Sequence, residues 1–302
     1  MTSDAQTATL TNPLADGAPA DPEDAILVAR AHSGDRASLE ELVRRHQRWI
    51  YNIAIRMLHH PQDAEDATQE ILLKAVTRLS SFEDRSSFRT WLYRIAVNHL
   101  LNTKRGRVER ESLTFREYGD GLDSIPDLDL PDPSGSLPDT RLLVNEAMLT
   151  CTSGMLLCLD REQRLTYVLG DVLDVSDTVG AELLQISREN FRQRLSRARR
   201  DLHSFMNDKC GLVNAANPCR CAKKTRGFIA AGYVDPEKLL FARDRVLEVR
   251  KALPRTLEDI KSLDDRCASV FRGHPFHEAP DLVPILRRLL ASPEFKGGAG
   301  LI

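Results

Sequence analysis

Arginine is concentrated on one side of the segment that follows Ser187. If residues 188 to 205 form a helix, Phe191, Leu195, Ala198 and Leu202 face inward. The outward side then carries Arg188, Arg192, Gln193, Arg197, Arg199 and Arg200 beside one acid, Glu189. Arginine neutralises phosphates and pairs with guanine in the major groove. This pattern predicts a nucleic-acid-reading helix whose binding weakens steeply with salt, against the alternative of a solvated cationic surface.

The residues before this helix indicate how it is presented to DNA. Ser176 is placed to cap a short helix that ends near Leu184, residues 185–187 form a tight turn, and Ser187 is placed to cap the arginine-rich helix. Two capped helices joined by such a turn predict a helix-turn-helix.

A second candidate DNA-binding face lies in residues 85 to 107. Ser86 or Ser87 can cap a helix whose expected core face is Phe88, Trp91, Leu92, Ile95 and His99. The other face combines cations for phosphates with amides that hydrogen-bond base edges. Its members are Arg94, Asn98, Asn102 and Arg105, with Lys104 and Arg107 just beyond. A basic surface helix without a ligand is the alternative.

An acidic stripe is expected on residues 63 to 79. Ala64, Ala67, Ile71, Ala75 and Leu79 recur at helical spacing and form the predicted buried face. Asp63, Asp66 and Glu70 fall on the opposite side, where they either contact a partner or are simply solvated.

The cysteines predict either a metal site, a redox pair or inert thiols. Cys210, Cys219 and Cys221 could supply three thiolates to zinc, with His203 as the fourth ligand. Alternatively, nearby cations at 220, 223 and 224 could make Cys219 or Cys221 redox-active. Cys151 and Cys158, seven residues apart, are expected to be small core residues.

The elements that carry these residues predict an all-α protein of several modules. The chain has 302 residues, 42% of them hydrophobic, and a net charge of -2 that conceals blocks of opposite sign. We expect a disordered leader (1–22), a helical bundle (23–106), an acidic, extended linker (107–138), the helix-turn-helix domain (139–207) and a cysteine-bearing helical extension (208–302). Helices are expected in the extension near residues 236–252, 256–271 and 280–290. No signal peptide or long apolar run is present, so we expect a cytoplasmic protein without membrane insertion.

Three strings in register resemble sigma factors of the extracytoplasmic-function (ECF) class over about residues 24 to 206. They are DAEDATQEILLKAV, SFRTWLYRIAVNHLLNTKR and ISRENFRQRLSRARRDL. The resemblance implies that Asp63, Asp66, Gln69 and Glu70 bind the beta-prime clamp helices of core RNA polymerase, whose beta flap is a further expected contact. It implies minus-ten promoter contacts from Arg89, Arg94, Asn98, Asn102, Lys104 and Arg105. It implies minus-thirty-five contacts from Arg188, Glu189, Asn190, Arg192, Gln193 and Arg197.

The resemblance leaves the extension unexplained. Two positions also depart from the family pattern: Gly180 replaces a branched apolar residue, and Gln185 replaces the glycine of the turn.

We expect no catalytic residue and no required cofactor, with zinc a candidate at the cysteines. The hypothesis for the extension is regulation of the sigma factor in cis, and a separate anti-sigma partner is left open. The alternatives are a stand-alone helix-turn-helix regulator, a thiol or metal sensor, and a thiol or metal enzyme housed after Asn207.

Overall fold

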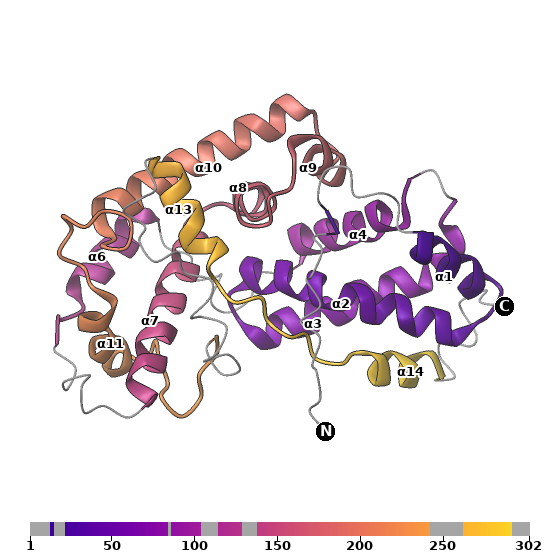
Figure 1. The fold of residues 1–302 in the computed structure, drawn as a ribbon, viewed down its shortest axis with the longest axis horizontal. Coiled ribbons are helices and arrows are strands. Elements are labelled where there is room, and N and C mark those ends of the chain that lie inside the picture. Colours follow the sequence, from indigo (N-terminus) through magenta and orange to yellow (C-terminus); the bar gives the residue numbers. More distant parts are fainter. Residues whose placement is uncertain are drawn as a thin grey trace, which may run out of the picture.

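A computed structural model describes residues 13–14, 22–83, 86–103, 114–128, 138–241 and 262–291. All regular elements in these ranges are helices and none is a strand, which confirms the all-α prediction. Figure 1 shows three parts: a bundle of α1 to α4, a second group built around α7 to α10, and C-terminal segments that run along both.

Within the described residues, the first bundle consists of four helices and one 3-10 turn. Its helices are α1 (Pro22–His32), α2 (Arg36–Leu58), α3 (Pro61–Thr77) and α4 (Phe88–Asn102), with a 3-10 turn at Leu79–Ser81. Gly34, at a φ of 89°, allows the turn after α1, and the Asp35 side chain accepts the Ala37 N–H at the start of α2. The Ser87 side chain accepts the Thr90 N–H and so caps α4.

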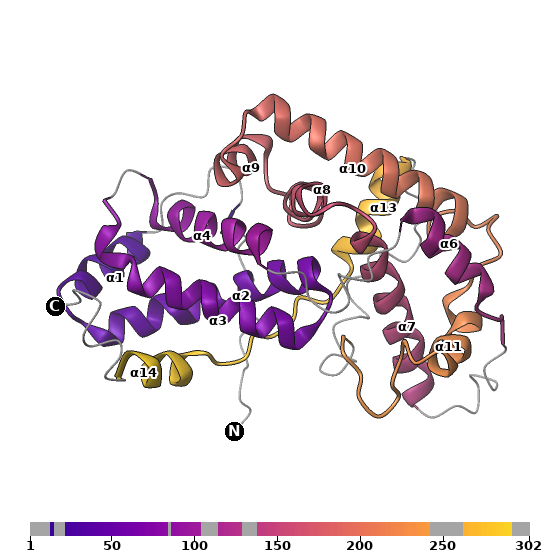
Figure 2. The same ribbon diagram turned by 180° about the vertical axis from the view of Figure 1, so that it is seen from behind.

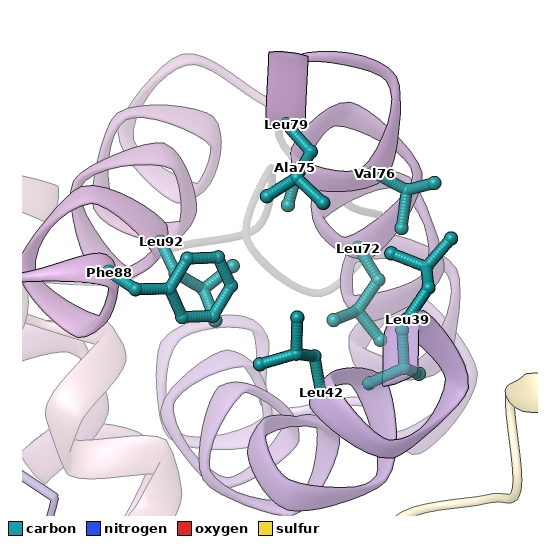
Figure 3. A pocket seen from close by; sticks show the side chains of 9 residues that line it. Leu39, Leu42, Leu72, Ala75, Val76, Leu79, Phe88 and Leu92 are labelled. Carbon is teal, nitrogen blue, oxygen red and sulfur yellow. The ribbon is translucent and has the colours of Figure 1, made fainter. Parts of the chain in front are cut away.

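The core of this bundle is mostly apolar, with Asn52 and Thr68 among its fully buried polar residues. Ile50, Ile53, Ala64 and Ile71 have no exposed surface. Figure 3 shows a small apolar pocket between α2, α3 and α4. Its lining is Leu39, Leu42, Val43, Leu72, Ala75, Val76, Leu79, Phe88 and Leu92. The helical periodicity of the sequence therefore identifies the buried faces of α2 and α3 correctly.

The second group contains the predicted helix-turn-helix. It consists of α7 (Pro138–Leu157), α8 (Arg161–Tyr167), a π-helical turn at Val168–Val172, α9 (Asp177–Leu184) and α10 (Arg188–Lys209). Ser176 and Ser187 cap α9 and α10, as their positions predict. Gln185 adopts a left-handed conformation at a φ of 55°.

Gly180 is explained by the packing of α9 on α10. A Cβ at this position would lie 2.3 Å from Cε2 of Phe191, which is buried in the same interface. The missing side chain lets the ring of Phe191 lie directly against the α9 backbone.

One buried arginine joins the two groups. Arg164 of α8 is 2% exposed, and its Nη1 donates to the Met57 carbonyl of α2 at 2.6 Å. Its Nε donates to the Leu156 carbonyl near the end of α7 at 3.0 Å. Carbonyls at helix C-termini lack partners within their own helix, so one guanidinium satisfies the ends of two helices from different parts of the chain.

Part of the expected extended linker is helical instead. Residues 115–124 form α6 (Phe115–Ser124), which starts with a capping box between Thr114 and Glu117. Phe115 packs on Phe205 of α10, with ring centroids 5.2 Å apart. Prolines and acids after this helix suggested a flexible tether, but the apolar face of α6 is buried against the second group. Residues 104–113 and 129–137 of the linker, and most of the leader, lie outside the described residues.

The extension crosses the whole molecule. It contains α11 (Cys221–Ala230), α13 (Leu263–Arg272) and α14 (Val283–Ala291). Figures 1 and 2 show α13 beside α10, and an irregular segment that leads from α13 to α14 beneath α2. The last two helices match expectation, whereas residues 236–241 form turns instead of starting a helix and 242–261 lie outside the described residues. The sequence analysis missed α11.

Candidate nucleic-acid interface

The predicted polymerase-binding residues lie together on α3. Asp66 and Glu70 are exposed, while Asp63 and Gln69 are partly exposed. Glu70 borders α4, with its Oε2 3.7 Å from Nε2 of His99. Burial and the ammonium of Lys74 lower the pKa of His99, so its neutral ring accepts a hydrogen bond from Lys74 at 2.6 Å. The carboxylates of Asp66 and Glu70 therefore face outward on a helix that is firmly packed on its other side.

The predicted minus-ten face of α4 is only partly free. Asn98 and Asn102 are exposed, and Asn102 Nδ2 donates to the Asn98 carbonyl at 2.8 Å. Arg89 donates to the carbonyl of Pro13, and Arg94 contacts α9. Lys104 and Arg105 lie outside the described residues.

The expected core face of α4 is only partly correct. Phe88 and Leu92 are buried, whereas Trp91, Ile95 and His99 are only partly covered. Tyr93, Ala96, Val97 and Leu100 have no exposed surface and form much of the contact with the bundle. Because α4 is covered by α1, α2 and α3 at once, a single-stripe pattern could not define its buried face.

On α10, the predicted minus-thirty-five residues lie in the first three turns. Arg188, Glu189, Arg192, Gln193 and Arg197 are exposed, and Asn190 is partly exposed. Asp177 at the start of α9 accepts hydrogen bonds from Arg192 and, at 3.1 Å, from Arg188. Gln193 Nε2 donates to Glu189 at 3.3 Å. This end of α10 presents cations and amides together on one accessible surface.

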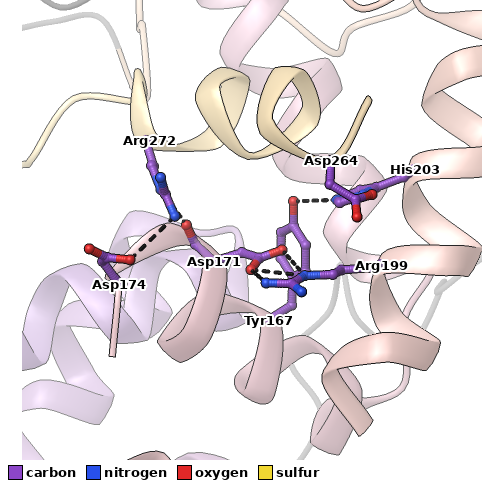
Figure 4. A network of polar contacts seen from close by, with 7 residues as sticks. All are labelled: Tyr167, Asp171, Asp174, Arg199, His203, Asp264 and Arg272. Atoms are coloured by element: carbon purple, nitrogen blue, oxygen red, sulfur yellow. Dashed lines mark hydrogen bonds and ion pairs between the residues drawn. The ribbon is translucent and has the colours of Figure 1, made fainter. Parts of the chain in front are cut away.

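Arg199, which the helical pattern placed outward, belongs to a buried network instead. Its guanidinium contacts both carboxylate oxygens of Asp171, which is 2% exposed, with the Nε to Oδ2 distance at 2.9 Å. The hydrogen bonds that Arg199 donates to the Asp171 carboxylate raise the pKa of Arg199. Arg272 of α13 donates to the Asp171 carbonyl at 2.6 Å, so the extension contacts the same turn (Figure 4).

His203, the predicted fourth metal ligand, is committed elsewhere. Its Nε2 lies 3.0 Å from the Tyr167 hydroxyl, and its Nδ1 lies 2.7 Å from Asp264 of α13. Figure 4 shows both contacts. The ligand set with His203 is therefore wrong: both ring nitrogens are used to join α10 to α8 and to the extension.

Cys151 takes the place near the cysteines where His203 was expected. In the structure Cys151 interacts electrostatically with Cys210, Cys219 and Cys221. Sequence spacing suggested a small core residue, and only the packing of α11 on α7 reveals the neighbourhood. Within the described ranges, no three side chains of His, Cys, Asp or Glu are already arranged to hold a metal ion.

The two parts that are predicted to bind DNA face each other in this structure. Arg94 of α4 donates to the Glu182 carbonyl at 3.2 Å through Nε and to its Oε1 at 3.1 Å through Nη2. Arg161 of α8 donates to the Leu101 carbonyl at the end of α4 at 3.1 Å. A residue expected to bind DNA is thus bound by the helix-turn-helix of the same chain.

Comparison with known proteins identifies the family. The sequence model of Sigma-70 region 2 matches residues 42–109. RNA polymerase sigma-H factor of Pseudomonas aeruginosa is 29% identical over 182 residues, which are 59% of this chain and 90% of that protein. RNA polymerase sigma factor YlaC of Bacillus subtilis is 31% identical over 171 residues, 57% of this chain and 93% of that protein. ECF RNA polymerase sigma factor SigE of Mycolicibacterium smegmatis is 30% identical over 180 residues, 58% of this chain and 65% of that protein.

The chain belongs to the ECF sigma factors. Among solved structures, CnrH in complex with the cytosolic domain of CnrY matches 61% of this sigma factor and 97% of that chain, at 24% identity and a TM-score of 0.43. Each of these matches covers most of the other protein but only about three fifths of this sigma factor, so roughly two fifths of its chain lie outside the matched region. No helix in its described portion is long and apolar enough to span a membrane.

Proposed function

We propose that this sigma factor binds core RNA polymerase through the acidic surface of α3 and directs it to promoters with α4 and α10. The observation that carries the proposal is that carboxylates are exposed on α3, whereas amides and arginines are exposed on α4 and α10, two helices that Ser87 and Ser187 cap. Complementary charge steers association and suppresses wrong partners. Base edges are read by the amide and guanidinium groups, while phosphates position the protein. We place this activity in the cytoplasm, with the polymerase.

We further propose that the described form is closed and that the extension holds it closed. Arg94 cannot contact DNA while it is bound to Glu182, so promoter engagement requires α9 to leave α4. The extension contacts both helical groups. Asp264 of α13 hydrogen-bonds to His203 of α10, and the backbone of His277 hydrogen-bonds to Asn52 of α2. An inhibitory role in cis would make a separate anti-sigma partner unnecessary.

Charge reversal tests the polymerase interface. Asp66→Lys and Glu70→Lys in one chain should abolish co-elution with core polymerase and run-off transcription, since attraction becomes repulsion at two exposed sites. Glu237→Lys, which changes an exposed loop far along the chain, is the matched control and should leave both unchanged. Equal binding by the reversed and control variants would refute the α3 assignment.

A second substitution tests the closed form. Glu182→Ala removes the acceptor side chain of Arg94 and should increase run-off output at limiting polymerase, while α9 keeps its other contacts. If output falls to the same extent as promoter binding, Glu182 contributes to DNA recognition, and the proposal of a closed form is wrong.

A further inference from the structure

Four thiols from separate parts of the chain converge where α7, the end of α10 and the start of α11 meet. We call them the thiol tetrad: Cys151, Cys210, Cys219 and Cys221. Cys151 and Cys219 pack against the same apolar cluster of α6, α7 and α11, and the backbone approach of Gly211 to Cys219 brings Cys210 close to them. None is in a disulfide. The remaining cysteines differ, because Cys158 lies just beyond the end of α7, seven residues after Cys151, and Cys267 belongs to α13.

The loop from 210 to 220 is built to bring its two ends together. A Cβ on Gly211 would lie 2.0 Å from the Cys219 carbonyl oxygen, so the start and end of the loop touch through the backbone. Asn217 Nδ2 donates to the Asn207 carbonyl at 2.8 Å and to the Cys210 carbonyl at 3.3 Å. Arg220 donates to the carbonyls of Ala215 and Cys219, both at 2.9 Å. Polar side chains thus hold the loop in shape without an apolar core of its own.

The backbone N–H groups of Leu212 and Val213 favour the thiolate form of Cys210, and that of Gly211 favours the thiolate form of Cys219, although burial outweighs them and raises the pKa of both thiols. Cys221 is the first residue of the ten-residue helix α11, where the helix dipole also favours negative charge.

We propose that the thiol tetrad binds Zn²⁺ in a tetrahedral, all-thiolate site. Soft thiolate ligands select zinc and other thiophilic ions, and four of them close a structural site. Since no three ligands in the described ranges are already arranged around an ion, binding draws the 210–220 loop toward Cys151 of α7. Lys224 and Arg220 lie close enough to Cys219 to offset the negative charge of the resulting centre.

Proton balance gives this proposal a signature. Burial raises the pKa of each thiol in the tetrad, that of Cys221 to about 12, so all are protonated at neutral pH without metal. One Zn²⁺ that replaces four thiol protons leaves a Zn(SR)₄ centre of charge 2- and releases four protons.

The experiment uses the full-length chain, reduced and stripped of metal, with Co²⁺ as a spectroscopic probe and then Zn²⁺. The wild type should take up one Co²⁺ with intense visible d–d bands and a sulfur-to-cobalt charge-transfer band, both lost when Zn²⁺ displaces it. Cys151→Ser should shift the d–d bands to those of a three-sulfur site, reduce proton release by one and weaken zinc binding at least about tenfold. Cys158→Ser, just beyond the end of the same helix, should match the wild type.

Weak octahedral bands in the wild type would mean an adventitious ion only and would overturn the proposal. Identical spectra for Cys151→Ser and Cys158→Ser would exclude Cys151 as a ligand, even with metal bound elsewhere. Alkylation followed by mass spectrometry gives a readout that survives if a variant folds poorly. In the wild type, Zn²⁺ should protect the tetrad and leave Cys158 reactive, and unchanged reactivity of Cys219 and Cys221 would contradict the site.

Discussion

The contact of Asn52 with the extension provides a sharp test of how the closed form is held. Asn52 is fully buried in α2, 225 residues before its partner. Its Nδ2 donates to the His277 carbonyl at 2.8 Å, and its Oδ1 accepts the His277 N–H at 2.8 Å. One amide side chain therefore satisfies both the backbone N–H and the backbone carbonyl of His277, as a neighbouring strand does in a β-sheet.

Asn52→Ala removes both bonds and leaves the two His277 groups without that partner. A hydrogen bond contributes about 1 kcal/mol net, so the local cost of losing two is about 2 kcal/mol. The Arg56 guanidinium also loses an acceptor, 3.1 Å away, which adds to the cost for the whole protein. A change of 2 kcal/mol corresponds to roughly 30-fold more frequent opening of this segment.

Hydrogen exchange of the His277 amide measures that opening directly. Its protection should fall by roughly 30-fold in Asn52→Ala, together with higher run-off output from the same chain. Asn102→Ala, in exposed surroundings on α4, is the control and should leave the His277 amide unchanged. If protection of His277 is the same in both variants while global stability drops in Asn52→Ala, the contact does not hold the extension, and the reasoning fails.

Three further outcomes are expected. Gly180→Ala should lower the free energy of unfolding by about 1–2 kcal/mol in denaturant titrations, because its Cβ would clash with Phe191. Gly121→Ala is the control and should be neutral or stabilising, because the space around Gly121 is open. A stabilising effect of Gly180→Ala would contradict this packing. Burial, with Arg56 nearby, lowers the pKa of His274 to about 3. Unfolded chains take up this proton below about pH 6.5 and the folded protein does not, so stability should fall from pH 7 toward pH 4 by up to about 1.4 kcal/mol per pH unit, and His274→Asn should flatten the curve. Arg197→Ala should reduce the salt dependence of promoter binding by about one unit of slope, and an unchanged slope would remove Arg197 from the phosphate contacts.

Local signals in the sequence identified most helices of the first two-thirds of the chain. Ser87, Ser176 and Ser187 cap the helices they were expected to cap, because capping depends on residues three positions away. The capping box at Thr114 was an equally local signal for α6, but the prolines and acids around it obscured it. Gly180 departs from the family pattern for a reason that only the position of Phe191 reveals.

Contacts between distant segments could not be derived in the same way. Nothing near Asn52 in the sequence points to His277, and nothing near Arg94 points to Glu182. Closeness in sequence predicts His203 as the fourth ligand beside the C-terminal cysteines. Cys151 comes near them only through the packing of α11 on α7. The promoter and polymerase contacts themselves remain predictions, since they depend on molecules outside this chain.

The pairing of Asn52 with His277 also sets an order of events during synthesis. Ribosomes add about 5–20 residues per second, so 225 residues separate the emergence of the two partners by roughly 10 to 45 s. During that interval Trp49, which finally packs on Phe276 at 4.7 Å between ring centroids, has no aromatic neighbour from the C-terminal segment. Under the regulation in cis proposed above, each newly made chain therefore has complete α4 and α10 helices before the C-terminal segment proposed to restrain them has been synthesised.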